Sequence, residues 1–314
     1  MPETRKIIID TDPGQDDAVA ILLALASPEL EILGLTTVGG NVSLKQVTRN
    51  ALQILEVAGK PDVPVYAGCE GPIRGKLVTA EYVHGESGLD GPTLPEPKAR
   101  AKTQHAVDFL INTLLTNDPG TITICALAPL TNLATAFIKA PAVVPRIKEI
   151  VLMGGGLFEG GNKTPAAEFN IFVDPEAADI LFKSGIPITV VPLDVSHGML
   201  TTPDRIARFR ALGNRSGVVT AEMLEFFELF DEQKYGQKGG PLHDPCVIAY
   251  LLKPELFEGR HINVAIETAS ELTRGMTVAD YWGVTSRPKN AMWLRRGNAD
   301  GFYDLLVERL KVLA

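Results

Sequence analysis

The amino-acid sequence predicts an α/β fold in which a mostly parallel central sheet is flanked by helices, with a C-terminal elaboration of helices and strands. Up to Thr201, short β-branched runs alternate with longer helical patterns. This alternation builds strand–helix–strand units, whose strands lie parallel in a sheet that is covered on both faces. No Pro/Ser-rich linker, charge block or internal repeat divides the chain, so we expect a single domain over residues 1–314.

Each expected strand is a short buried run, and the helices between the strands begin at residues that favour a helix N-terminus. The strands, in order, are Lys6–Ile9, Ile32–Thr37, Val63–Tyr66, Thr121–Cys125, Ile150–Met153 and Ile188–Val191. The helices are Asp17–Ser27, Ser43–Ala58 with Ser43 as its cap, Thr103–Thr116 with Thr103 as its cap, Leu130–Lys139 and Pro175–Lys183.

The pattern changes after Thr201, where helices precede a short series of strands. The expected helices are Pro203–Ala211, Val218–Gln233 and Asp244–Leu252; the strands are Ile262–Glu267, Met276–Val278 and Ala291–Leu294, and a last helix starts at Asp300. The earlier segment 68–102 has little periodicity for its length, and loops that long are usually functional or disordered. Because it contains His84 within a polar motif, we expect it to be functional.

Charge and hydropathy exclude two classes of partner. Thirty Lys and Arg against 38 Asp and Glu give a formal net charge of −8, so no global positive field would attract a nucleic acid. The longest apolar run, Ala18–Ala26, is far shorter than the roughly 20 residues that cross a bilayer, so no membrane association is expected.

The N-terminus and the cysteines indicate where the protein is located. The N-terminus lacks a signal-peptide pattern. Cys69, Cys125 and Cys246 lack metal-ligand spacing, which indicates free thiols, and both observations favour a cytoplasmic location.

Four carboxylates lie within the eight residues Asp10–Asp17, directly after the first expected strand. Ligands bind at the carboxyl ends of the strands in open α/β sheets. A Pro-Gly turn and a helix cap would explain two of the four acids, and Asp10 and Asp12 remain. Crowded carboxylates repel one another unless a cation or protons neutralise them, which favours a metal site over the turn and cap. Oxygen ligands without a nearby His or Cys indicate a hard cation such as Ca²⁺ or Mg²⁺.

Other ligand motifs fit the chain less well. It contains no GxxxxGK[ST] loop, the acidic spacing is not that of an EF-hand, and Gly154–Glu159 lacks the last glycine of a dinucleotide fingerprint. Asp10-x-Asp12 is similar to the motif of the haloacid-dehalogenase phosphatases, but that motif ends in Thr or Val where this chain has Gly14. A phosphatase of this kind is therefore the weaker enzymatic alternative.

A second polar group follows the expected strand that ends at Met153. Asn162, Glu168 and Asn170 lie in an expected loop that ends at Asp174, and their amide and carboxylate groups suit the hydroxyls of a ribose-like diol. Asn also populates ordinary turns, and for Asn162 alone the two interpretations are equally supported.

His243 and Asp244 place an imidazole beside a carboxylate at the start of an expected helix. An imidazole that titrates near neutral pH suits general acid catalysis. The alternative is a solvated His next to a helix-capping Asp. His84 and Tyr235 are weaker candidates, because a lone His in a loop is more often incidental and a Tyr more often packs.

Six short motifs follow one another along the chain. They are Asp10–Ala18, Thr37–Asn41, His84–Gly88, Met153–Gly156, Ala167–Asn170 and His243–Pro245. In residues, order and spacing they resemble the inosine–uridine nucleoside hydrolase family, from residue 7 to about 310. Within that family the chain is most similar to the bacterial pyrimidine ribonucleoside hydrolases, through Gly88–Pro92, Gly161–Ala167 and Leu251–Phe257. The resemblance implies a Rossmann-like fold and hydrolysis of the N-glycosidic bond of ribonucleosides to base and ribose, in nucleoside salvage.

The resemblance also implies roles for individual residues. It implies that Ca²⁺ is bound by Asp12, Asp17, Asp244 and the main-chain carbonyl of Leu127. It implies ribose contacts from Asp16, Asn41, Met153, Asn162, Glu168 and Asn170. Asp12 would take the proton of an attacking water, and Asp10 would brace the acidic loop. His243 would protonate or hydrogen-bond the departing base, assisted by Tyr235 and His84.

The same resemblance implies a homodimer or homotetramer whose ligand is a small ribonucleoside. Neither Trp282 nor Trp293 matches the stacking tryptophans of purine-specific members, so we expect uridine and cytidine to be favoured over inosine. The alternatives are a purine-preferring or non-specific hydrolase and a nucleoside-binding protein without turnover. The presence of Asp12 beside a complete metal set argues against the binding protein, because binding requires no base.

Overall fold

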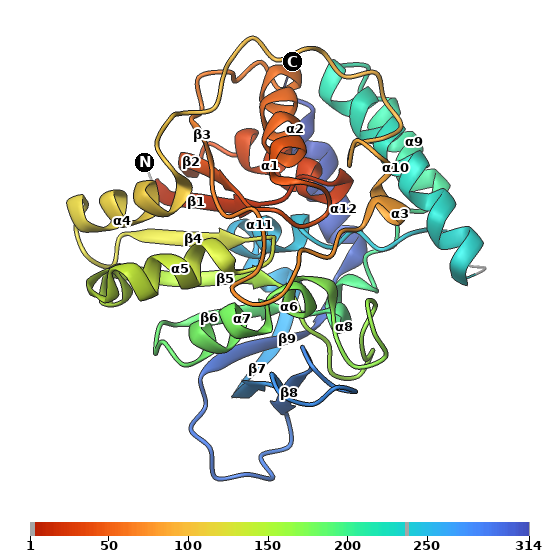
Figure 1. The fold of residues 1–314 in the computed structure, drawn as a ribbon. Coiled ribbons are helices and arrows are strands. Elements are labelled where there is room, and N and C mark those ends of the chain that lie inside the picture. Colours follow the sequence, from red (N-terminus) through yellow and green to blue (C-terminus); the bar gives the residue numbers. More distant parts are fainter. Residues whose placement is uncertain (1–3, 236–238, 314) are drawn as a thin grey trace.

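One nine-stranded sheet runs through both halves of the chain (Figure 1). The computed structural model describes residues 4–235 and 239–313, with the backbone alone at 229–235, and orders the strands β3-β2-β1-β4-β5-β6-β9-β7-β8. The strands are β1 Arg5–Thr11, β2 Leu30–Thr37, β3 Val65–Ala67, β4 Ile122–Ala126, β5 Ile147–Met153, β6 Ile188–Val191, β7 Phe257–Ile266, β8 Thr277–Asp280 and β9 Ala291–Gly297. The pairs from β3 to β9 are parallel, and the β9–β7 and β7–β8 pairs are antiparallel, which confirms the predicted mostly parallel sheet.

The predicted helices form with small differences at their ends. They are α1 Gln15–Leu25, α2 Leu44–Val57, α4 Ala106–Thr116, α5 Thr131–Lys139, α7 Pro175–Phe182, α9 Pro203–Arg210, α10 Arg215–Tyr235, α11 Pro245–Leu252 and α12 Ala299–Leu310. The predicted cap Thr103 is wrong: α4 is capped by His105, whose Nδ1 accepts a hydrogen bond from Val107 N at 3.2 Å. Ser43 is the N-cap of α2 but makes no side-chain cap hydrogen bond.

Five short helices are missing from the prediction. They are α3 Glu81–His84, α6 Phe169–Val173, α8 Leu193–Ser196 and the 3₁₀ turns η1 Pro141–Arg146 and η2 Pro254–Leu256. Segments of three to six residues span at most two helical turns, so they show no hydrophobic period in the sequence.

Alternation along β1 builds a hydrophobic core on each face of the sheet. Ile7 and Ile9 pack in one cluster with side chains of α1, α2, α10, α11 and α12. Ile8 points to the other face and packs with side chains of α4, α5 and α7. Both clusters are closed to solvent.

The strand order reverses next to β1. The chain first adds β2 and β3 on one side of β1 and then places β4, β5 and β6 on its other side. The loops that leave the carboxyl ends of β1 and β4 therefore diverge to opposite sides and leave a crevice, which is the ligand-binding position of open α/β sheets. Within the described ranges, no helix is long and apolar enough to cross a membrane.

Candidate functional site

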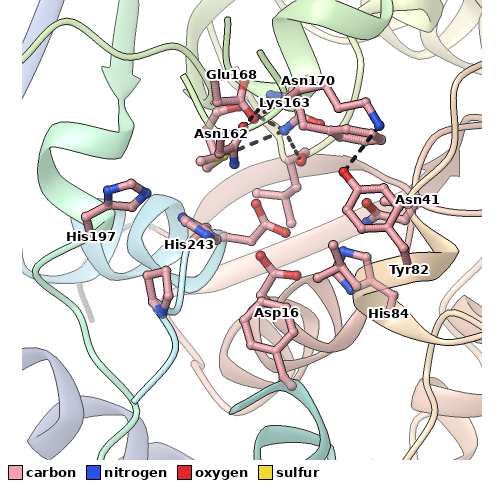
Figure 2. Close-up of a pocket in the computed structure, with 18 residues that line it drawn as sticks. Asp16, Asn41, Tyr82, His84, Asn162, Lys163, Glu168, Asn170, His197 and His243 are labelled. Atoms are coloured by element: carbon pink, nitrogen blue, oxygen red, sulfur yellow. Dashed lines mark hydrogen bonds between the residues drawn. The ribbon is translucent and has the colours of Figure 1, made fainter. Parts of the chain in front are cut away.

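A cavity lies at this crevice, above the carboxyl ends of the central strands (Figure 2). All six residues predicted to contact ribose line it, and they are Asp16, Asn41, Met153, Asn162, Glu168 and Asn170. His84, Leu127, His243 and Asp244 line it as well. Asp12 and Asp17 are buried and do not line its wall, and the side chain of Tyr235 lies outside the described residues. The topology thus brings together residues that are up to 228 positions apart, from Asp16 to Asp244.

Asp17 organises the acidic loop after β1. Its Oδ1 accepts hydrogen bonds from Thr11 Oγ1 at 2.5 Å and Asp12 N at 3.2 Å, and its Oδ2 accepts one from Gly14 N at 3.1 Å. The N-cap of α1 is Gly14, so neither Asp16 nor Asp17 is the N-cap. Asp17 instead stands in the first turn of the helix, where a carboxylate is favoured by the helix dipole.

Asp12 is held against the loop that follows β2. Its Oδ2 accepts a hydrogen bond from Asn41 N at 2.6 Å, and a Cβ added at Gly40 would overlap with that oxygen, so the close approach requires glycine. Asn41 Nδ2 donates to Asp12 O at 3.0 Å and to Asp17 Oδ2 at 3.2 Å. These bonds occupy the side-chain amide hydrogens of Asn41, so its Oδ1 is the atom that remains to accept a hydrogen bond from a ligand. The other oxygen of Asp12, Oδ1, is buried without a partner.

Asp16, Asp17 and Asp244 form an acidic triad, in which one carboxylate oxygen of each lies within 4.8 Å of the others. Asp244 stands at the N-cap position of α11 but makes no side-chain cap hydrogen bond, so the simpler explanation of Asp244 as a helix cap does not hold. The metal ligands that the resemblance implies are the carboxylates of Asp12, Asp17 and Asp244 and the main-chain carbonyl of Leu127. The structure places Asp16 with Asp17 and Asp244, although the sequence had assigned Asp16 to the ribose.

The donor set fits a hard divalent cation. Burial and neighbouring carboxylates raise the pKa of Asp12 and Asp244, and they raise the pKa of Asp16 to about 7. Asp12 Oδ1 and Asp16 Oδ1 are both buried without hydrogen-bond partners. Unpartnered buried oxygens are costly unless a positive charge or protons compensate them, and an all-oxygen site suits Ca²⁺ or Mg²⁺.

Asp10 makes its hydrogen bonds at the carboxyl end of β1, whereas the resemblance implied that it would brace the acidic loop. Its Oδ1 accepts hydrogen bonds from Thr36 Oγ1 at 2.6 Å and Asn132 Nδ2 at 2.8 Å, which tie β1 to β2 and to α5. Burial raises the pKa of Asp10 to about 6.

These raised pKa values predict how the metal-free protein responds to pH. An acid whose pKa is higher in the folded state than in the unfolded state stabilises the fold only while it is protonated. Asp10, Asp16 and Glu168 have folded pKa values of about 6 to 7, against roughly 4 when unfolded, so stability should fall as pH rises from about 4 to 7. Thermal unfolding of chelated protein should show a Tm lower by roughly 5–10 °C at pH 8 than at pH 5. Added Ca²⁺ should raise the Tm at pH 8 and have little effect at pH 5, and a Tm of chelated protein that rises with pH would contradict the expectation.

Glu168 is fixed by the backbone at the start of α6. Its Oε1 accepts a hydrogen bond from Asn170 N at 2.9 Å, and its Oε2 accepts from Gly155 N at 3.0 Å and Ile171 N at 3.2 Å. Burial nevertheless raises its pKa to about 7. The expected loop around Glu168 is therefore partly a helix, of which Glu168 is the N-cap.

The neighbouring amides are oriented by main-chain groups. Asn170 Nδ2 donates to Leu127 O at 2.8 Å and Met153 O at 3.2 Å, and Asn162 Oδ1 accepts from Phe169 N at 3.0 Å. The groups left for a ligand are thus the Oδ1 of Asn170 and the Nδ2 of Asn162, one acceptor and one donor. With the Glu168 carboxylate they match the donors and acceptors of a vicinal diol.

Two imidazoles, those of His84 and His243, line the cavity together with the acids and amides (Figure 2). His243 Nδ1 lies 2.7 Å from Ser196 Oγ, and burial, with smaller effects from His197 and His84, lowers its pKa to about 3. Burial lowers the pKa of His84 to about 4. Both rings are neutral at pH 7 here, which differs from the expected imidazole that titrates near neutral pH. Each ring therefore offers an N–H or a lone pair rather than a full positive charge.

The sequence analysis missed three polar residues that line the cavity, namely Tyr82, Lys163 and His197. Lys163 Nζ donates to Tyr82 Oη at 3.2 Å and lies 4.6 Å from the centre of the Tyr82 ring, at the exposed side of the cavity (Figure 2). His197 lies beside His243, with ring centres 5.9 Å apart, and its Nδ1 is 3.1 Å from Glu159 Oε2. Tyr82 and Lys163 stand within two positions of predicted site residues, which is the signal that could have found them. His197 has no such neighbour in sequence.

Comparison with known proteins agrees with this geometry. A family model described as "Inosine-uridine preferring nucleoside hydrolase" matches residues 7–304. The pyrimidine-specific ribonucleoside hydrolase RihA of Photobacterium profundum is 49% identical over 308 residues, which cover 98% of this chain and 99% of that protein. An uncharacterized protein of Schizosaccharomyces pombe is 55% identical over 97% of this chain and 98% of its own length. The solved structure of a purine-preferring ribonucleoside hydrolase from Gardnerella vaginalis is similar with a TM-score of 0.91 at 34% identity, over 98% of both chains.

Proposed function

The chain belongs to the inosine–uridine preferring nucleoside hydrolase family and is an N-ribohydrolase, and we propose that it prefers the pyrimidine ribonucleosides uridine and cytidine and uses Ca²⁺. One observation carries the proposal: Asp16 and Asp244, two members of the acidic triad, line the same cavity as Glu168 and Asn170, whose groups suit a diol. Identity of 49% to a pyrimidine-specific relative, against 34% to a purine-preferring one, supports the preference for pyrimidines. Family membership sets aside the phosphatase and the binding protein without turnover.

The cation would be held by Asp12, Asp17, Asp244 and the Leu127 carbonyl, with Asp16 as a further candidate from its place in the triad. When bound, it would supply positive charge that lowers the pKa of water and favours the binding of ribose hydroxyls. Glu168 and Asn170 Oδ1 would accept hydrogen bonds from the ribose, and Asn162 Nδ2 would donate one.

The chain's own residues account for the proton transfers. Water attacks the anomeric carbon, a new C–O bond forms and the N-glycosidic bond breaks, with positive charge developing on the ribose. Asp12 Oδ1, which has no partner in the structure, would take the water proton. Direct attack inverts the anomeric carbon, and no covalent nucleophile is needed. An N–H of His243 would stabilise the negative charge on the departing base.

Incubating the purified protein with uridine, cytidine, inosine and 2′-deoxyuridine tests the function. We expect free base and free ribose, detected as reducing sugar, from the ribonucleosides. Turnover of 2′-deoxyuridine should be slower by roughly 10² or more, because a site built to bind a hydroxyl is left with unpaired polar groups. Intact, bound nucleoside without released ribose would contradict the proposal.

We further propose that the protein forms a homodimer or homotetramer in the cytoplasm. Membership of the nucleoside hydrolase family supports the assembly, and the free thiols of Cys69, Cys125 and Cys246 support a reducing compartment. Light scattering at micromolar concentration should give a mass two or four times that of the 33.8 kDa chain. A mass near 33.8 kDa would rule out the assembly.

A further inference from the structure

We propose that Gln15 fixes the tautomer of His84, so that His84 presents an unprotonated Nε2 to the cavity and accepts a hydrogen bond from an N–H group of the nucleobase. The inference rests on the proposed function and deepens it, because it assigns the group by which His84 recognises the base. Gln15 is then a positioning residue, and His84 is a specificity residue rather than an assisting acid.

The hydrogen bonds of Gln15 determine which way its amide points. Its Nε2 lies 3.0 Å from the main-chain oxygen of His84 and 3.2 Å from that of Asp90. Both oxygens can only accept, so the amide atom that faces them must be the NH₂ group. The amide oxygen therefore faces His84 Nδ1, at 2.6 Å.

The orientation of Gln15 then determines where the imidazole proton lies. An amide oxygen only accepts, so a 2.6 Å contact with it requires the proton on His84 Nδ1. In a neutral imidazole the lone pair is then on Nε2. His84 lines the cavity, and none of the described residues makes a hydrogen bond to its Nε2. Because burial holds the pKa of this ring near 4, the neutral form is the one present at pH 7.

Packing keeps the ring in this position. His84 stacks on Phe227, with ring centres 5.6 Å apart and planes inclined by 23°. On the other side a Cβ at Gly14 would lie 2.6 Å from Nδ1, so the ring is pressed against the acidic loop. A turn of the ring by 180° about Cβ–Cγ would keep the stack on Phe227 but lose the 2.6 Å contact between Nδ1 and Gln15 Oε1.

An acceptor at this position selects a definite edge of the base. Uracil offers N3–H and cytosine offers its 4-amino group, whereas a nitrophenyl leaving group offers no N–H. Because an acceptor cannot protonate the base, any proton for the base must come from elsewhere, and His243 is the imidazole that faces the same cavity.

Nitrogen NMR of the histidine-labelled wild-type protein tests the tautomer directly. The chain has five histidines, and His84→Asn identifies the signals of His84. We expect a protonated Nδ1 and an unprotonated Nε2 at pH 7. A protonated Nε2, or a doubly protonated ring, would overturn the inference, and this result does not depend on turnover.

Kinetics of Gln15→Leu test the contact with the base. Gln15→Leu should lower kcat/KM for uridine by about tenfold, as expected for a lost hydrogen bond, and leave that for nitrophenyl riboside within about twofold. Gln53→Leu is the matched control, since Gln53 is also buried and its Nε2 donates at 3.1 Å to Pro95 O in the same segment as His84. Gln53→Leu should alter neither substrate.

Equal losses on both substrates in Gln15→Leu would overturn the base contact and leave the proposed function standing. If wild-type protein released no ribose from any nucleoside, the proposed function would fail, and with it the role of His84 toward the base. Circular dichroism of each variant separates these results from misfolding.

Discussion

Asp12→Asn should leave the fold intact and lower kcat for uridine by at least about three orders of magnitude. The substitution keeps the shape of the side chain, and its amide can be oriented so that an oxygen still accepts from Asn41 N. It removes the carboxylate oxygen that is buried without a partner, which is the proposed base and a proposed metal ligand. One substitution thus removes two groups that would stabilise the transition state, the base and a metal ligand.

The kcat of purified variant and wild type, with metal content from elemental analysis, measures this effect. Asp304→Asn is the control, because Asp304 is an exposed acid on α12 that pairs with Arg208 outside the cavity. Asp304→Asn should retain full activity. Near-normal turnover in Asp12→Asn, or in protein shown to be free of metal, would contradict the proposed mechanism.

His243→Ala should lower kcat/KM for uridine by about 10²-fold and that for nitrophenyl riboside only a few-fold. Uracil is a poor leaving group that needs a hydrogen bond or a proton, whereas nitrophenolate departs with little help. His243 is the imidazole whose Nδ1 is already held by Ser196, so its ring has a defined orientation toward the cavity.

Measuring kcat/KM for uridine, cytidine, inosine and nitrophenyl riboside on both proteins tests the role of His243 and the base preference together. His261→Ala serves as the control, because His261 is exposed on β7 and does not line the cavity. Equal losses of kcat/KM on all four substrates would show that His243 does not assist the leaving group. Wild-type activity on inosine tenfold above that on uridine would refute the pyrimidine preference.

The longer elements could be predicted because their physical requirements are local. A buried parallel strand such as β6 is a continuous β-branched run, and a helix such as α2 repeats its apolar residues over several turns. Short helices such as α3 and α6 have no such period. Their positions depend on tertiary contacts, as with α6, whose N-cap Glu168 also receives the N–H of Gly155 from the end of β5.

Much of the candidate site could be predicted for a different reason. Several acids at a strand end need neutralising, and amides with a carboxylate suit a diol, so residue type and position are informative by themselves. Asn162, Glu168 and Asn170, which this chemistry assigns to a diol, line one cavity accordingly, together with the three ribose contacts that only the resemblance implied, Asp16, Asn41 and Met153. The resemblance to a known family added the individual roles, which chemistry alone had left open.

The sequence by itself determined the fold class, the edge of the sheet that holds the site and the chemical types of its groups. The tertiary structure decided which atom of each group is free to act. Asn41 uses its amide hydrogens on Asp12 and Asp17, and Gln15 fixes the proton of His84 across 69 positions of sequence. Such choices depend on the partners that each polar atom meets once it is buried, and folding brings those partners from distant segments where no local pattern records them.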